Sequence, residues 1–158
     1  MPLFRFYTKK RLAASLILSI LTFAFIWAAP LRAQDETTLF EADGRATAYI
    51  AEDMTIYLWS GKPVAYLYPD SGHEGFDIYG FNGKHLGWFI RGIARDHDGD
   101  AACGVKSAVS LPQLEPLKSL KELKPLKSLR ELRPLRPIFS RSWSDVPCRI
   151  FLFEGSEG

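Results

Sequence analysis

Four turn dipeptides, each followed by the same pattern of side chains, constrain the fold of residues 38–105 more than any other feature. Glycine adopts positive φ without strain, and Asn or Asp before it tolerates the left-handed region, so these pairs favour two-residue hairpin loops. The dipeptides are Asp43-Gly44, Ser60-Gly61, Asn82-Gly83 and Asp98-Gly99. We therefore expect residues 38–105 to form four β-hairpins.

The fourth residue after each of these glycines is small. The small residues are Ala48, Ala65, Gly87 and Cys103, and the next positions hold Tyr49, Tyr66 and Trp88, with Gly104 breaking the aromatic pattern. Alternate residues of a strand share a face, so the small side chains should face one way and the aromatic ones the other. Four backbones crowded at equivalent points predict a mainly β, shallow barrel around a pseudo-fourfold axis. An unrelated β-meander with ordinary turns is the alternative.

Three tracts of this domain resemble the bacterial four-fold β-flower family, and the likeness spans about residues 38–144. The tracts are residues 59–67, 78–89 and 95–99. The resemblance implies four hairpin petals around a small-residue core, and frequent association with a membrane helix or lipid anchor. It also implies a loose likeness to tubby-type C-terminal domains, some of which bind membrane lipids, but no activity. The chain departs from the family pattern at Asp100, in place of a basic residue, and in the Ser71–Gly75 insertion.

Residues 1–34 have the pattern of a targeting segment. The stretch 12–29 has no charged residue and follows the cluster Lys9, Lys10 and Arg11. As a helix it would extend ~27 Å, close to the ~30 Å hydrocarbon core of a bilayer. Two interpretations stay open, an uncleaved single-pass membrane anchor and a cleaved secretory signal, because small residues lie near Ala33 but Leu31 departs from the cleavage motif. Both place residues 35–158 outside the cytoplasm, on the periplasmic or extracellular side or secreted.

Export allows a disulfide between Cys103 and Cys148, the two cysteines of the chain. Two independent buried thiols are the alternative. A disulfide would tie the C-terminal tail, residues 145–158, to the hairpin domain.

A strap of period three follows the hairpins within residues 106–144. Leucine recurs at every third position from Leu111 to Leu135, and Ile138 continues the row. An α-helix needs ~3.6 residues per turn and would be broken by Pro116, Pro125 and Pro134, whereas polyproline II has three residues per turn. We expect a polyproline-II-like strap on or near the hairpin domain, with a leucine stripe and a basic stripe. The basic stripe is Lys118, Lys121, Lys124, Lys127, Arg130, Arg133 and Arg136.

The charge of the chain, 20 basic against 18 acidic residues, is unevenly distributed. Residues 35–104 hold 12 acidic and five basic residues, and residues 105–158 hold 10 basic and six acidic ones. We therefore expect the basic stripe to face the acidic domain while the leucines cover apolar surface of the barrel. The stripe could instead bind anionic lipid or another polyanion. A protein partner and disorder are further alternatives, and nucleic acid is not expected.

Catalytic and metal-binding patterns are weak. Asp96-His97-Asp98-Gly99-Asp100 resembles part of a calcium loop, but its Gly is fourth rather than sixth, and Ser107 stands at the twelfth position. A polar hairpin tip is the better interpretation. We expect no cofactor, no metal and no enzymatic activity, and a hydrolase built on Asp96, His97 and a serine is the weakest alternative.

The leading hypothesis is a non-enzymatic, exported or membrane-anchored binding or structural module of the bacterial envelope. Its membrane contact would be residues 12–29. We expect a lipid or another slender apolar ligand at the petal axis, lined by Ala48, Ala65, Gly87 and Cys103, with Tyr49, Tyr66 and Trp88 nearby. An anionic-membrane binder using the basic stripe is the alternative. The oligomeric state does not follow from the sequence.

Overall fold

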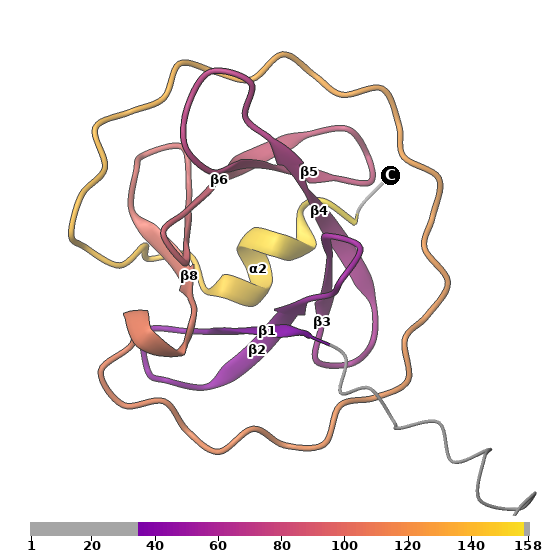
Figure 1. Cartoon of the computed structure of the whole chain (residues 1–158), viewed down its shortest axis with the longest axis vertical. Coiled ribbons are helices and arrows are strands. Elements are labelled where there is room, and N and C mark those ends of the chain that lie inside the picture. The colour runs from indigo at the N-terminus through magenta and orange to yellow at the C-terminus, as the bar shows by residue number, and fades with distance from the viewer. Residues whose placement is uncertain (1–34, 157–158) are drawn as a thin grey trace, which may run out of the picture. The chain divides into compact units, whose positions relative to one another are not determined.

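The computed structural model describes residues 35–156, and the first part of this range forms a closed, antiparallel barrel of eight strands (Figure 1). Each strand pairs with the next, and Phe40 pairs with Gly104 to close the barrel. Consecutive strands therefore form four hairpin petals. The strands are β1 (Thr37–Phe40), β2 (Ala46–Ile50), β3 (Thr55–Leu58), β4 (Pro63–Pro69), β5 (Phe76–Gly80), β6 (His85–Ile90), β7 (Ile93–Arg95) and β8 (Ala101–Gly104).

The petal tips have three-residue loops, so the expectation of two-residue loops was wrong. At the first tip, the Glu41 N–H donates to the Arg45 carbonyl at 3.0 Å and the Gly44 N–H donates to the Glu41 carbonyl at 2.9 Å. The same pair of bonds recurs at the tips that hold Gly61, Gly83 and Gly99. The four glycines have φ of 83–90°, whereas the residue before each of them has negative φ. This is the three-residue loop in which a left-handed glycine follows a turn and forms a bulge.

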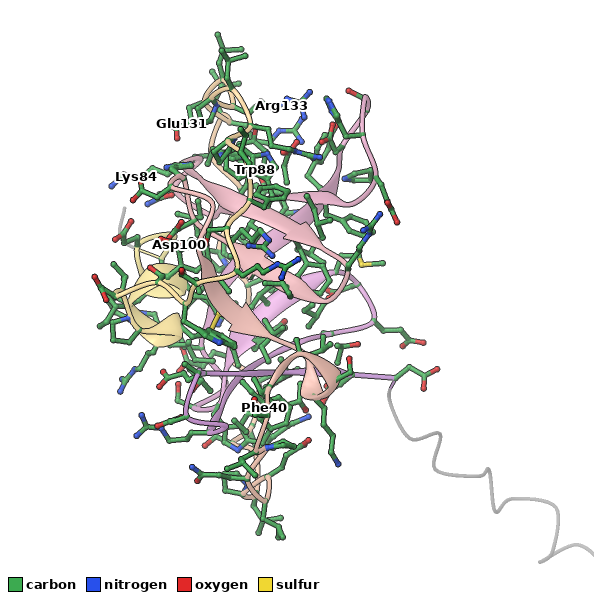
Figure 2. All side chains as sticks on the ribbon, turned by 90° about the vertical axis from the view of Figure 1, so that its left-hand side faces the viewer. Phe40, Lys84, Trp88, Asp100, Glu131 and Arg133 are labelled. Atoms are coloured by element: carbon green, nitrogen blue, oxygen red, sulfur yellow. A yellow bond between two sulfur atoms is a disulfide. The ribbon has the colours of Figure 1, made fainter. Side chains whose placement is uncertain are left out.

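The interior of the barrel is filled by aliphatic side chains, and a short helix, α2 (Cys148–Phe153), covers one end of the axis (Figures 1 and 2). Cys103 forms a disulfide with Cys148 of this helix. Phe151 and Leu152 pack in the same core cluster as Ala48 and Ala65. The sequence predicts residues 145–158 as a C-terminal tail that a disulfide could tie to the domain; in the structure this part of the chain forms α2 and covers one end of the axis.

A second short element, the 3-10 helix η1 (Lys106–Ala108), follows β8 and leads into the strap. The expected membrane helix, residues 12–29, lies outside the described residues. Within residues 35–156, no helix has the length and apolar character needed to cross a membrane.

Candidate functional site: a strap with a leucine rim

The strap, residues 111–138, encircles the barrel and meets one petal tip after another (Figure 1). It contains no helix or strand. Three backbone N–H groups of the strap and one just beyond it donate to the carbonyl oxygens of the four tip glycines at 2.8–3.1 Å. The donor and acceptor pairs are Gln113 and Gly44, Glu122 and Gly61, Glu131 and Gly83, and finally Ser140, just beyond the strap, and Gly99. These donors are nine residues apart, so one nine-residue repeat of the strap serves each petal.

The tip glycines are required by the strap as well as by the turn. A Cβ atom added to Gly44 would lie 1.8 Å from the Leu111 carbonyl oxygen. At Gly61 the distance to the Leu120 oxygen would be 1.9 Å, and at Gly83 the distance to the Leu129 oxygen would be 2.1 Å. The sequence carries a signal of this arrangement. Its prolines recur every nine residues, which is the length of strap that spans one petal.

The aromatic residues of the petals lie on the outer face of the barrel, under the basic stripe. The ammonium nitrogen of Lys118 is 4.4 Å from the ring centroid of Tyr49, and that of Lys127 is 3.9 Å from the centroid of Tyr66. Such cation–π contacts contribute roughly 0.5–2 kcal/mol each, depending on desolvation. The third predicted aromatic residue, Trp88, packs against Phe139, with ring centroids 6.2 Å apart.

Carboxylates of the barrel pair with the same basic stripe. Lys118 and Lys121 both lie 2.7 Å from the carboxylate of Glu36. Lys124 pairs with Asp53. The strap is therefore held by charge complementarity at several points around the barrel.

The most buried of these carboxylates is Asp70, whose side chain is inaccessible to solvent. It accepts hydrogen bonds from the guanidinium groups of Arg133 and Arg136 and from the backbone N–H of Gly72. Figure 2 shows Arg133 and Glu131 on the strap above Trp88. This anchor fixes the strap over the insertion between β4 and β5.

The strap lowers the pKa values of its carboxylate partners. Burial raises the pKa of Asp70, but the Gly72 N–H and the Arg133 and Arg136 guanidinium groups outweigh burial, and the net pKa is below its ordinary value. Burial likewise raises the pKa of Glu36, and the hydrogen bonds and charges of Lys118 and Lys121 bring it below its ordinary value. The ionised carboxylates thus favour the bound strap.

The leucine stripe faces away from the barrel, so the expectation that it covers apolar surface was wrong. Its ten aliphatic side chains are 80–98% exposed. Figure 2 shows carbon-only side chains projecting outward where the strap passes the upper and lower ends of the view. The stripe faces outward because the outer surface of the barrel is aromatic and acidic, which suits Lys and Arg. We call these side chains the leucine rim: Leu111, Leu114, Leu117, Leu120, Leu123, Leu126, Leu129, Leu132, Leu135 and Ile138.

The side chains of the leucine rim together expose a large apolar area. Burial of one Leu or Ile side chain contributes about 1.5–3 kcal/mol at ~25 cal/mol per Å², which corresponds to about 60–120 Å² per side chain. Ten such side chains expose roughly 600–1,200 Å². The largest apolar patch on a typical monomer measures roughly 300–600 Å² and often has a function. The leucine rim is therefore the candidate functional site.

The residues predicted to line the axis do lie together in the barrel, but the chain itself fills the space beside them. Ala48, Ala65 and Cys103 are fully buried in one cluster with α2. A Cβ atom on Gly87 would lie 1.9 Å from the Arg95 carbonyl oxygen and 3.3 Å from the Phe151 ring. The expected position of an apolar ligand is thus occupied by α2, which moves the candidate site from the axis to the leucine rim.

The acidic tip at residues 96–100 is an ordered turn. The Asp96 carboxylate accepts the backbone N–H groups of Asp98 and Asp100 at 3.1 and 2.9 Å. The His97 ring stacks on His85, with 2.9 Å between Nε2 of His97 and Nδ1 of His85. Over residues 35–156, no group of three or more His, Cys, Asp or Glu side chains is arranged to hold a metal ion.

Comparison with protein families gives one match that covers most of the chain. The family model described as "4-fold beta flower protein" matches residues 37–152. No curated protein and no solved structure matches the chain.

Proposed function

The chain belongs to the four-fold β-flower family, and we propose that it is a non-enzymatic module of the bacterial envelope that binds an apolar partner through its leucine rim. The observation that carries the proposal is the exposure of ten aliphatic side chains in one row, at every third residue of the strap. The barrel, the tip glycines and the basic stripe hold this row in place. Uncovered apolar surface of this size favours association in water.

The proposal includes export of the domain, with residues 12–29 as a membrane anchor or a cleaved signal. The disulfide between Cys103 and Cys148 supports an oxidising compartment. N-terminal sequencing of the chain from membrane and soluble fractions tests the two forms. A membrane-bound chain that begins at residue 1 identifies an anchor, and a chain that begins near residue 34 identifies a cleaved signal.

We also propose a polyproline-II conformation for the strap. The period of three, the regular prolines and the separation of leucine and basic rows support this conformation. Circular dichroism of a peptide of residues 111–138 tests whether the strap has this preference by itself.

The alternative of an anionic-membrane binder has less support. The basic stripe, which would have to face lipid headgroups, contacts Glu36, Asp53, Asp70 and the tyrosine rings. A hydrolase built on Asp96, His97 and a serine has no specific observation in its favour, because Asp96 stabilises its own turn and His97 stacks on His85.

Thiol protection in cells tests the proposed role of the leucine rim. The Leu123→Cys variant of the full chain carries one free thiol on the rim, since both native cysteines form the disulfide. We expect a small maleimide to label this thiol several-fold more slowly in cells than in the purified, dilute chain. The control is Glu52→Cys, at an exposed loop outside the rim. Equal labelling of Leu123→Cys in both settings would show a bare rim and would refute the proposal.

A further inference from the structure

The leucine rim is convex and continues around the barrel, which restricts what can cover it. Its side chains follow a strap that meets the tips of all four petals in turn (Figure 1). A flat bilayer that approaches from the side of the barrel touches such a rim only along one short arc and leaves the leucines of the other petals in water. Coverage of the whole rim requires partners on several sides.

A second copy of the chain has the matching surface. Both rims carry a leucine at every third residue, so the side chains of one can fit between those of the other at the same spacing. The contact would also not set the two basic stripes directly against each other, because the basic stripe of each strap faces its own barrel and pairs with Glu36, Asp53 and Asp70.

One contact between two convex rims buries little surface area. Three leucines from each copy would cover roughly 360–720 Å² in total. A stable interface usually buries more than about 1,000 Å². One contact is therefore too weak to hold a dimer, whereas several contacts around the same molecule act together.

The nine-residue repeat supplies several equivalent contacts. Each repeat carries three rim residues and serves one petal, so the rim presents three leucines on each of three sides and Ile138 at the fourth petal. We propose that copies of this chain associate edge to edge through their leucine rims, each with up to three neighbours. This inference rests on the proposed function, because it names the partner that the leucine rim binds.

Cross-linking of rim cysteines in cells tests the inference on the full chain. Leu114 and Leu132 are 18 residues apart, or two repeats, and so belong to opposite petals. In a Leu114→Cys/Leu132→Cys variant, a short bis-maleimide should produce a ladder of covalent products at multiples of the monomer mass, which is 17.8 kDa for the uncleaved chain. The single variant Leu123→Cys should give a dimer and nothing larger.

Two control variants sharpen the result. Leu114→Cys/Leu117→Cys places both thiols on one side of the rim, so its ladder should be at least several-fold weaker beyond the dimer. Replacement of the remaining rim leucines by Gln in the Leu114→Cys/Leu132→Cys chain should remove the ladder if the leucines drive association.

The outcomes separate this inference from the proposed function. Products of other masses alone, or a protected thiol without any product, would overturn self-association and leave the leucine rim as a binding surface for another protein or for lipid. Dimers without a ladder from Leu114→Cys/Leu132→Cys would overturn the several-neighbour arrangement. An unprotected thiol would overturn both proposals.

Discussion

Gly83 occupies a position where backbone conformation and the approach of the strap both exclude a side chain. Its φ is 88°, and an added Cβ would lie 2.1 Å from the Leu129 carbonyl oxygen. A left-handed conformation costs an L-residue about 1–2 kcal/mol, and displacement of the strap adds to that cost. We expect Gly83→Ala to lower the free energy of unfolding by at least ~1–2 kcal/mol in urea titrations.

The matched control for this substitution is Gly72→Ala. Gly72 lies in an exposed loop, and the nearest atom to an added Cβ is 3.9 Å away. It should change stability by less than ~0.5 kcal/mol. Equal effects of the two alanines would contradict the role assigned to the tip glycines.

Asp70 should contribute more to stability than any exposed carboxylate of the domain. Asp70→Asn leaves the guanidinium group of Arg136 without its charge partner and leaves Arg133 only the more distant Asp77, at 3.6 Å. Loss of one partner from a fully buried pair costs about 3–5 kcal/mol, but the arginines are 35% and 21% exposed, so we expect about 1–3 kcal/mol. Glu74→Gln, in the exposed pair with Arg91, should cost less than ~1 kcal/mol in the same denaturation experiment. A smaller loss for Asp70→Asn than for Glu74→Gln would argue against the anchor.

At the scale of elements, the disulfide joins β8 to α2 and closes a loop that contains the whole strap. Cys103 and Cys148 are 45 residues apart in sequence. A crosslink of this span contributes about 2–4 kcal/mol by restricting the unfolded chain. Reductant, or the double variant Cys103→Ala/Cys148→Ala, should therefore lower the melting temperature clearly. Unchanged melting in reductant would show that packing of Phe151 and Leu152 suffices to hold α2.

The four petals could be predicted because a hairpin is a local structure with local signals. The small residues and the turn glycines recur at fixed spacing, and this spacing defines the axis. Helix α2 could not be predicted in the same way, because its six residues are too few to show a helical period and its partners are distant in sequence. The direction of the strap was also missed. A period of three separates leucines from basic residues but does not say which row faces inward; the tyrosine rings and carboxylates of the barrel decide that.

At the scale of the whole molecule, stability should fall with pH in two stages. Burial lowers the pKa of His85 from its ordinary 6.5, with Asp77 opposing this effect, so the folded state disfavours the charged ring. The contribution of the neutral His85 ring to the free energy of unfolding is complete above pH 6.5 and decreases as pH falls below that value. The pKa values of Glu36 and Asp70 are lowered from 4.5 and 3.8, so their contributions are present above those values and are lost as pH falls further. Urea unfolding from pH 8 to pH 3 checks this, and Asp70→Asn should flatten only the acidic stage.

Folding and association place different demands on the leucines of this chain, and the difference can be measured. Leu39 is fully buried in the barrel, so Leu39→Ala should cost about 2–5 kcal/mol of unfolding free energy. Leu120, Leu123 and Leu126 are 93–96% exposed, so replacement of all three by Gln should change stability by only ~0.5 kcal/mol per site or less. Thermal melting of the two variants checks this contrast. A large loss in the triple variant would mean that the leucine rim supports the fold; near-normal melting would mean that the fold does not need these leucines, and that their apolar character serves contacts outside the molecule.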